Sequence, residues 1–329
     1  HNYLLNKLKN KKILNIYKKF ESCLDINDNY VVAVSGGPDS LALTFLSKIY
    51  SIKNSLNPKY IIIDHKLRKN STSEVKYIKN RLKKFSIKLD ILTWNGAKPK
   101  KNIQSVARGK RYELLFKTAT KYNCRNILLG HHLDDLFENF FIRILRGSGL
   151  NGLVSLDKKT KNNNINIIRP LLDFSKKDLI LISNSIFGTY IKDPSNEDDQ
   201  FKRVKVRNFL KQLENEGLDR NKFLLTIKNL KFANESIKYY VKNNLKENVI
   251  IFEKKNFLIL KKSFFCQSQE VIFRSFTEVI KLVGKKYYPS RGKKIDNILE
   301  LLSVKTQFKV TLGGCVIKKV NETVIVSKE

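Results

Sequence analysis

The sequence predicts an α/β protein with a doubly wound parallel sheet, followed by a helical connector and a small α+β C-terminal domain. Short apolar runs alternate with stretches of helical periodicity in the first part of the chain, which is typical of strand–helix–strand units. Polar clusters stand directly after three of the expected strands, where sheets of this kind bind ligands. Beyond about residue 215 the regular alternation ends, which indicates a second domain.

The elements of the first part follow from apolar spacing. An amphipathic helix is expected at the N-terminus from its apolar residues Leu4, Leu5, Leu8 and Ile16. The β-branched run at 31–34 predicts a buried strand, and Leu41, Phe45 and Ile49, four apart, predict the helix that follows it. Later strands are expected at 60–64, 87–94 and 126–129, with helices around 75–82 and at 103–122.

The second part mixes helices and strands without alternation. Helices are expected at 221–240, 268–283 and 293–302, and strands at 249–252, 257–260, 308–312 and 316–320. Gly313 and Gly314 separate the last two strands, as in a hairpin turn. The expected domains are therefore 1–215 and 216–329, with a helical connector at roughly 205–240.

Composition limits the class of protein. The chain has 329 residues, of which 42% are hydrophobic, enough for two domains with sizeable cores. Its four cysteines show no CxxC spacing, which disfavours a zinc ribbon, an iron–sulfur site or a disulfide scaffold and is consistent with the reducing cytoplasm. No signal peptide and no run of about 18 apolar residues is seen, so no membrane partner is expected.

The charge is strongly basic. Lys and Arg number 64 against 30 Asp and Glu, a net charge of +34, which favours a polyanionic partner such as nucleic acid. A general bias toward Lys, Ile and Asn, visible at 158–168, is the alternative explanation.

The stretch SGGPDS at 35–40 links the first strand to the first helix. It brings together two glycines, Pro38 in the first helical turn, and Asp39 and Ser40 as capping side chains. Free backbone N–H groups and a helix N-terminus at one point suit a phosphate. The stretch is neither a Walker P-loop, since it lacks Lys, nor a GxGxxG turn. An ordinary turn before a capped helix is the alternative.

A second polar cluster lies at 127–153. A helix is expected to begin near His131, which would place His131, Asp135 and Glu138 on one face. Carboxylates facing a phosphate loop would bind Mg²⁺. Asp134 and Asp135 as helix-capping residues are one alternative, and a zinc site, for which no third ligand is evident, is another. Arg146, at the end of this helix, would reach an anionic ligand.

These motifs resemble known families. SGGPDS is similar to the pyrophosphate loop of the N-type ATP pyrophosphatases (the PP-loop superfamily, with a Rossmann-like fold). The whole chain resembles the tRNA(Ile)-lysidine synthetase family through the motifs SGGPDS, DHKLRKNSTSE (64–74), NIQSVARGKRYELL (102–115), HHLDDLFEN (131–139), RGSGLNGL (146–153), IRPLL (168–172) and DPSNEDDQFKRVKVR (193–207). The match is strongest over 30–210, and the segment LGGCVI (312–317) resembles the substrate-binding domain of that family.

The resemblance implies a carbon–nitrogen ligase. Members of the family that the chain resembles use ATP to adenylate the C2 oxygen of the wobble cytidine of tRNA(Ile) with a CAU anticodon. Free L-lysine then displaces AMP to form lysidine. ATP and Mg²⁺ are the implied cofactors, tRNA(Ile) and lysine the partners, and the cytoplasm the location. The oligomeric state stays open, with a homodimer as one option.

The resemblance also implies roles for single residues. The ATP loop comprises Ser35, Gly36, Gly37, Pro38, Asp39 and Ser40, with Arg146 as a further ATP contact. Asp39 and Asp135 are the expected Mg²⁺ ligands and, with His131 as a phosphate contact or base, the expected catalytic residues. Substrate or tRNA contacts are expected from Arg108, Arg111, Asp193, Arg203 and Arg207, for which solvated or structural ion pairs are the alternative. The chain departs from the family pattern at Lys66, Asn139 and Val204.

Three rival functions compete with this interpretation. A tRNA 2-thiocytidine enzyme of the same superfamily normally needs CxxC pairs, which are missing. An amidotransferase-type synthetase would need an ammonia source in a domain of its own. A non-catalytic basic RNA-binding protein would not need Asp39, Ser40 and Asp135, all of which are present.

Overall fold

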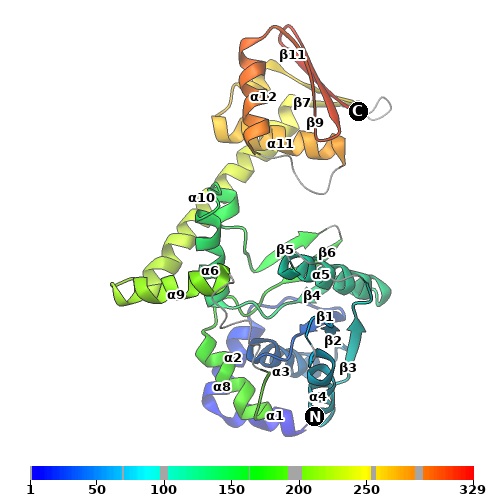
Figure 1. Cartoon of the computed structure of the whole chain (residues 1–329), viewed down its shortest axis with the longest axis vertical. Coiled ribbons are helices and arrows are strands. Elements are labelled where there is room, and N and C mark those ends of the chain that lie inside the picture. The colour runs from blue at the N-terminus through cyan, green and yellow to red at the C-terminus, as the bar shows by residue number, and fades with distance from the viewer. Residues whose placement is uncertain are drawn as a thin grey trace. The chain divides into compact units, whose positions relative to one another are not determined.

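The computed structural model describes residues 2–68, 70–96, 103–162, 164–191, 202–252, 257–285 and 292–329. The chain divides into two compact units, His1–Leu218 and Asp219–Glu329, here the N-terminal and C-terminal units (Figure 1).

The N-terminal unit contains a six-stranded sheet in the order β3-β2-β1-β4-β6-β5. Its strands are β1 (Tyr30–Val34), β2 (Lys59–Asp64), β3 (Leu89–Thr93), β4 (Asn126–Leu128), β5 (Lys159–Asn162) and β6 (Ile165–Ile168). The neighbouring strands from β3 to β6 pair in parallel, and β5 is an antiparallel edge strand. The predicted doubly wound sheet is confirmed. The hairpin β5–β6 was not predicted, because its Lys- and Asn-rich edge strand lacks an apolar run.

Helices cover both faces of this sheet. They are α1 (Asn2–Asn6), α2 (Lys11–Glu21), α3 (Pro38–Lys53), α4 (Ser71–Lys83), α5 (Ile103–Lys121), α6 (Leu133–Ile144), α7 (Leu150–Leu153), α8 (Lys176–Phe187) and α9 (Lys202–Asn215), with a 3₁₀ turn η1 (Lys7–Lys9). Val32 and Val34 point into the core shared with α2, α3, α4 and α8, whereas Val31 faces the core under α5. The period-2 alternation of a strand therefore fills two cores.

The N-terminus forms two helices where one was expected. Asn10 interrupts the helical run, because its side-chain oxygen accepts hydrogen bonds from the backbone N–H groups of Lys12 (3.0 Å) and Ile13 (3.2 Å) and caps α2.

The C-terminal unit packs two helices against a five-stranded antiparallel sheet ordered β7-β8-β11-β10-β9. Its elements are α10 (Arg220–Asn248), β7 (Val249–Phe252), β8 (Phe257–Leu260), η4 (Lys262–Phe265), α11 (Gln269–Gly284), α12 (Gly292–Val304), β9 (Gln307–Leu312), β10 (Cys315–Val320) and β11 (Thr323–Lys328). The expected α+β build is confirmed. The strand β11 was not predicted, although it pairs with both β8 and β10 in the middle of the sheet.

Helix α10 runs past its expected end at 240. Asn244 donates hydrogen bonds from Nδ2 to Ser275 Oγ (3.1 Å) and to the carbonyl of Phe264 (3.3 Å), and Asn248 donates to Asn244 Oδ1 (2.8 Å). This buried amide network secures the last turns of the helix against η4 and α11.

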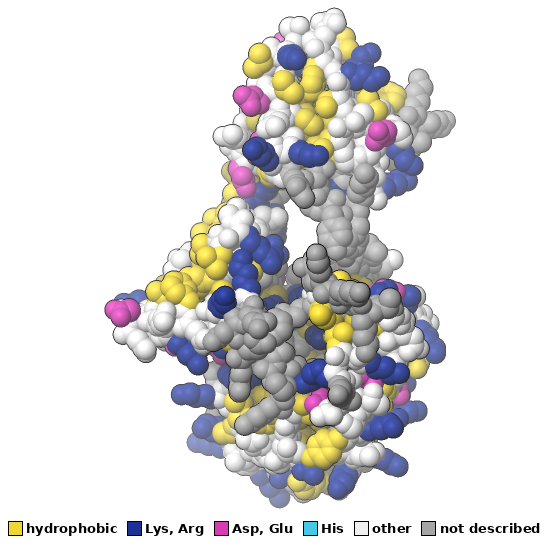
Figure 2. Space-filling view, viewed as in Figure 1, with side chains coloured by type: hydrophobic (Ala, Val, Ile, Leu, Met, Phe, Trp, Pro, Cys, Tyr) yellow, Lys and Arg dark blue, Asp and Glu magenta, His cyan; other side chains and the backbone are white. Residues whose placement is uncertain are grey.

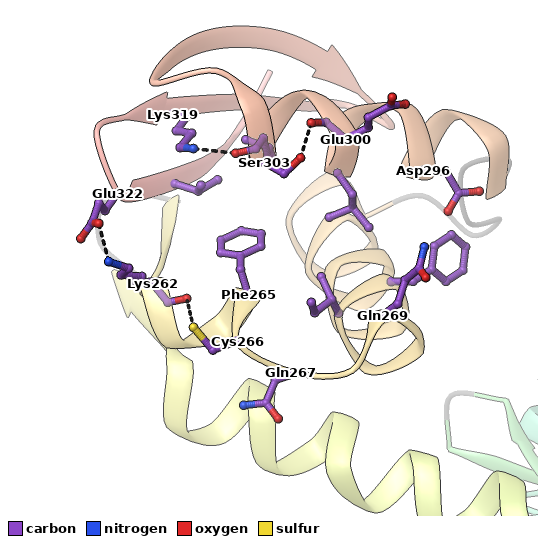
Figure 3. A pocket seen from close by; sticks show the side chains of 15 residues that line it. Lys262, Phe265, Cys266, Gln267, Gln269, Asp296, Glu300, Ser303, Lys319 and Glu322 are labelled. Carbon is purple, nitrogen blue, oxygen red and sulfur yellow. Dashed lines mark hydrogen bonds and ion pairs between the residues drawn. The ribbon is translucent and has the colours of Figure 1, made fainter.

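A cavity of about 740 Å³ lies in the C-terminal unit beside η4, α11 and α12 (Figure 3). Phe265 and Leu299 line its apolar part. At its rim Lys262 donates to Glu322 (2.5 Å), and Lys319 donates to the carbonyl of Leu302 (2.5 Å). The lysines of the rim are therefore engaged within the unit.

The strand order reverses at β1. Chain connections lead from β1 to β2 and β3 on one side, and to β4 and β6 on the other. In open α/β sheets, ligands bind beyond the carboxyl ends of the strands at such a reversal point. The loops after β1 and β4 meet there.

Candidate active site

The loop after β1 is held in shape by Ser40. The Ser40 hydroxyl accepts a hydrogen bond from the backbone N–H of Ser35 (3.0 Å), lies 3.1 Å from Ser35 Oγ, and donates to the carbonyl of Gly37 (3.0 Å). Gly37 is the N-cap of α3, and Pro38 follows in its first turn. The N–H groups of a first helical turn have no intrahelical partner, so they are available to an anion.

The backbone conformation at Gly36 favours glycine, and a side chain there would also displace the end of Ile191. The φ of Gly36, +84°, lies in the left-handed region, and a Cβ would stand 2.9 Å from Ile191 Cδ1. The carbonyl of Gly36 also accepts a hydrogen bond from the backbone N–H of Ile191 (2.9 Å). The loop is thus pressed against the segment that follows α8.

Gly130 brings the second polar cluster to the first. A Cβ at Gly130 would lie 3.3 Å from backbone atoms of Asp39 and Ser40. The chain leaving β4 therefore passes directly over the N-terminus of α3, and α6 begins beside the phosphate loop.

His132 lies among three carboxylates. Its Nδ1 is 2.6 Å from Asp135 Oδ2, and its backbone N–H donates to the same oxygen (3.0 Å). Its Nε2 lies 3.9 Å from both Asp39 Oδ1 and Asp134 Oδ2. Burial would lower the pKa of His132, but the hydrogen bond to Asp135 and the charges of Asp135 and Asp39 outweigh burial and raise it. Burial likewise would raise the pKa of Asp135, but His132 lowers it well below the ordinary range.

The start of α6 corrects the sequence expectation. The helix begins at Leu133 with His132 as its N-cap, so His131 precedes the helix and does not share its face with Asp135 and Glu138. Asp135, at the third position of the helix, accepts the hydrogen bond from the backbone N–H of the N-cap His132, an arrangement that fixes the N-terminus of a helix.

Asp39 is paired with a lysine from a distant part of the sequence. Lys176 Nζ, in the first turn of α8, donates to both carboxylate oxygens of Asp39 at 2.7 Å. Both side chains are partly exposed. An ammonium group beside the phosphate loop would also contact the phosphates of a bound nucleotide.

The donor set meets the requirements of Mg²⁺ only in part. Among the described residues, no group of three or more His, Cys, Asp or Glu side chains is arranged to hold a metal ion. Mg²⁺, however, commonly takes one or two carboxylates plus phosphate oxygens and waters. Asp39 and Asp134 lie on the Nε2 side of His132, whereas Asp135 binds its Nδ1.

His131 lies in cationic surroundings. Burial, with the charges of Arg108, Arg169 and Arg203, lowers its pKa to about 3, although Asp135 opposes this. Its Nδ1 is buried and has no hydrogen-bond partner among the described residues. His131 is therefore neutral at physiological pH.

Glu138 and Arg207 join α6 to α9. Glu138 is only 2% exposed, and its Oε1 accepts a hydrogen bond from Arg207 Nε at 2.8 Å. Burial raises the pKa of Glu138, although the Arg207 charge opposes this.

The third polar cluster, after β2, has a structural role. The Asp64 carboxylate accepts hydrogen bonds from Ser71 Oγ (2.9 Å), Thr72 Oγ1 (2.7 Å) and the backbone N–H of Lys66 (2.9 Å). These bonds fasten the loop after β2 to α4. They hold the pKa of Asp64 below its ordinary value, although burial opposes them.

The remaining expected residues are not all brought to the phosphate loop. Arg108 packs on the Tyr112 ring (5.3 Å), and Arg111 helps burial to lower the pKa of His65 to about 4. Arg146 is exposed just beyond the C-terminal end of α6, about 20 Å along the helix axis from its first turn. Asp193 lies outside the described residues.

Sequence reasoning missed His132 and Lys176. The spacing in the sequence does not separate the two histidines, because each has an aspartate three residues later, Asp134 for His131 and Asp135 for His132. Only the start of α6 at Leu133 makes His132 the N-cap. Lys176 has no local signal, because it reaches Asp39 only through the packing of α8 on α3.

Comparison with known proteins gives the family. The model of the PP-loop domain matches residues 5–214, which lie within the N-terminal unit. The tRNA(Ile)-lysidine synthase of Wolbachia pipientis wMel is 32% identical over 306 residues, covering 92% of this chain and 71% of that protein. The chain belongs to the tRNA(Ile)-lysidine synthase family. The enzyme of that name from Rickettsia akari (strain Hartford) is 31% identical over 327 residues, covering 95% of this chain and 74% of that protein.

A solved structure agrees with the fold. The structure of the U34-tRNA thiolase NcsA from Methanococcus maripaludis, with its [4Fe-4S] cluster, superimposes on this chain with a TM-score of 0.59. The superposition covers 69% of this chain and 81% of the thiolase chain. At 19% identity the likeness concerns the fold alone.

This member of the tRNA(Ile)-lysidine synthase family has four free cysteines, Cys23, Cys124, Cys266 and Cys315. None of the described helices is both long and apolar enough to span a bilayer.

Proposed function

We propose that this chain ligates free L-lysine to C2 of the wobble cytidine of a tRNA(Ile) with a CAU anticodon. The observation that carries the proposal is the meeting of the SGGPDS loop with the carboxylates around His132 where the strand order reverses. Membership of the tRNA(Ile)-lysidine synthase family supports the same reaction. The reduced cysteines suit a cytoplasmic enzyme.

The N-terminal unit binds ATP. The N–H groups around Gly36 and Gly37 and at the start of α3 hold the pyrophosphate portion, and Lys176 adds a positive charge beside it. Asp39 and Asp135 would hold Mg²⁺, and Asp134 adds a carboxylate on the Asp39 side of His132. Bound Mg²⁺ would supply charge stabilisation for the departing pyrophosphate.

The reaction has two bond exchanges. The C2 oxygen of the cytidine attacks the α-phosphorus of ATP, and the bond to pyrophosphate breaks as the new O–P bond forms. The ε-amine of lysine then attacks C2, the C2–O bond breaks, AMP leaves, and the amine nitrogen loses a proton. The first exchange is necessary because an unmodified C2 oxygen is a poor leaving group.

The two adjacent histidines, His131 and His132, have different roles in the reaction. His132 carries a raised pKa, so its protonated form adds a positive charge near the phosphates. His131 is neutral and too weakly basic to take a proton from an ammonium group, and serves as a phosphate contact.

The tRNA is held by basic residues of both units. Arg108, Arg111, Arg203 and Arg207 contact the substrate, and Asp193, which lies outside the described residues, is a contact that the family resemblance implies. Arg146, at the far end of α6, would contact tRNA more readily than ATP. The C-terminal unit serves as the tRNA-binding domain.

Nucleoside mass analysis tests the proposal. The protein, ATP, lysine and tRNA(Ile) should yield lysidine and AMP, and Asp39→Ala should abolish both while the circular dichroism spectrum is unchanged. Asp28→Ala, at an exposed acid of the same unit, serves as the matched control and should behave like wild type. AMP without lysidine would indicate another PP-loop reaction, and tRNA binding without AMP would indicate a non-catalytic RNA-binding protein.

A further inference from the structure

Helix α10 has a hydrophobic face that the fold does not use. Leu225, Phe232 and Tyr239 recur every seven residues on one side of the helix, and Tyr240 lies beside them. They are 55%, 60%, 62% and 57% exposed, respectively. Figure 2 shows hydrophobic side chains gathered along the flank of this helix, with lysine and arginine side chains next to them. Phe232, Tyr239, Tyr240 and Leu225 are called the aromatic face below.

The opposite side of α10 is the side that is buried in the fold. Phe223, Ile227, Asn234, Val241, Asn244 and Asn248 are buried there, at helical spacing. Asn234, for example, accepts a hydrogen bond from Arg274 of α11 (2.7 Å). The aromatic face therefore contributes nothing to the buried side of the helix, and large exposed apolar patches commonly mark interaction sites.

The charge on α10 determines the kind of partner. Its basic residues are Arg220, Lys222, Lys228, Lys231, Lys238, Lys242 and Lys246, and its acidic residues are Glu235 and Glu247. Two such helices would repel each other, which disfavours pairing with a second copy, whereas a polyanion is attracted. Lys228 Nζ lies 5.7 Å from the centre of the Phe232 ring, so positive charge and aromatic surface alternate along this side.

We propose that the aromatic face, with Lys228 and Lys242, binds unpaired nucleotides of the tRNA by base stacking. This inference rests on the proposed function, since it assigns a surface to the same tRNA. Exposed rings interleaved with lysines are the arrangement by which proteins hold single-stranded nucleic acid. In a helix the neighbouring base pairs stack and cover the faces of each base, so the bases that reach these rings come from a loop or an end.

The geometry suits a strand lying along the helix. Residues seven apart on an α-helix are separated by roughly 10 Å along its axis, so Phe232 and Tyr239 would receive bases from different nucleotides. Tyr239 and Tyr240 pack edge to face with ring centres 5.6 Å apart, so their planes are nearly perpendicular and a given base can stack on only one of them. Lys228, before Phe232 in the helix, and Lys242, after Tyr240, would meet the backbone phosphates near the two ends of the row of rings.

The rings are tested by removing and by restoring them in the full chain. Phe232→Leu with Tyr239→Leu keeps apolar bulk and helix propensity but removes both aromatic planes. We expect the dissociation constant for tRNA to rise about tenfold for each ring lost. Phe232→Tyr with Tyr239→Phe keeps both planes and should bind within about twofold of wild type. Tyr77→Ala, at an exposed tyrosine of α4, is the matched control.

The lysines are tested by salt dependence. Lys228→Gln with Lys242→Gln should reduce the slope of log K against log salt by about one for each lysine. Lys238→Gln removes a lysine that is already paired with Glu235 (2.8 Å) and should change the slope less. The ring-removing variant should leave the slope unchanged, because stacking releases no counterions.

The choice of RNA separates stacking from general attraction. A single-stranded oligonucleotide of about 12 nucleotides should lose affinity in the ring-removing variant, whereas a duplex of equal length should not. Equal binding of tRNA by the ring-removing variant and wild type would overturn the proposal. So would a change from dimer to monomer with unchanged RNA binding, which would assign the face to a second copy.

Failure of the proposed function has a different signature. In that case the wild-type chain itself forms no lysidine, whatever the state of α10. If wild type forms lysidine and the ring-removing variant binds tRNA normally, only the inference about the aromatic face is wrong.

Discussion

Replacing Arg207 by alanine should destabilise the N-terminal unit more than replacing its partner Glu138 by glutamine. The two side chains form one ion pair, but Glu138 is 2% exposed and Arg207 39% exposed. Without Glu138, the guanidinium can return to water at small cost. Without Arg207, a carboxylate remains in the interior with no counter-charge from that side chain.

The magnitudes follow from this asymmetry. Removing one partner of a buried ion pair costs about 3–5 kcal/mol, and the partial exposure of Arg207 places Arg207→Ala near the lower end. Glu138→Gln, which keeps the shape of the side chain, should cost about 1 kcal/mol. For a unit of this size, about 3 kcal/mol lowers the melting temperature by roughly 6–12 °C.

The cost of Arg207→Ala should depend on pH. Burial raises the pKa of Glu138 in the folded state, so the folded chain binds this proton more tightly than the unfolded chain. The stability that this proton contributes is complete below the unfolded carboxyl pKa and is lost as pH rises through the folded value. Without the Arg207 charge the pKa of Glu138 in the folded state rises further. The loss of unfolding free energy in Arg207→Ala should therefore be small near pH 4.5, where Glu138 is protonated, and complete at pH 7.

Tryptophan fluorescence provides a selective assay. Trp94 is the one tryptophan of the sequence and is buried in the N-terminal unit, so its emission follows the unfolding of that unit by urea or heat. Lys205→Ala, at an exposed lysine of α9, is the control and should have little effect. Equal losses in the two ion-pair variants, or a loss in Arg207→Ala that is the same at pH 4.5 and 7, would refute the reasoning.

Three further expectations concern the sheet edge. Asp135→Asn should slow single-turnover adenylation about 100-fold or more and change tRNA affinity by less than about threefold. It should also lower the pKa of His132 in an NMR titration. If tRNA binding is lost while bound tRNA still reacts normally, Asp135 is only a structural helix cap. Gly130→Ala should weaken ATP binding in calorimetry, because its Cβ would stand 3.3 Å from the backbone of Asp39; unchanged affinity would show that the loop has room. Asp64→Ala should cost about 3 kcal/mol at pH 7 in urea unfolding. The lowered pKa of Asp64 means that this contribution to stability exists above pH 4 and fades as pH falls through the folded value, so a stability loss in Asp64→Ala that does not shrink as the pH is lowered below 4 would contradict it.

Local sequence patterns were enough to predict the parallel sheet and the position of the candidate site. The alternation of apolar runs and helical spacing determined the parallel sheet, because a short continuous apolar run predicts a buried strand whereas apolar residues at a period of 3.6 predict a helix. The SGGPDS loop and the acids after β4 were placed at one edge for the same reason, since the carboxyl ends of parallel strands lie together. The edge strand β5 was missed because Lys159–Asn162 has no apolar run, and its stability comes from pairing with β6. The last strand β11 was missed although it begins with a β-branched run of the kind that predicts a strand.

The partners of the site residues were decided only by the tertiary structure. No spacing rule connects Lys176 to Asp39 or Arg207 to Glu138, because each pair is formed by helices that pack together although they are far apart in the sequence. Of the two adjacent histidines, the backbone at the start of α6 decides which one meets the carboxylates: His132 is the N-cap and binds Asp135, while His131 turns into cationic surroundings and stays neutral. A sequence specifies which charges are present, but the pKa and the role of each depend on burial and on the charges that packing brings within a few ångströms.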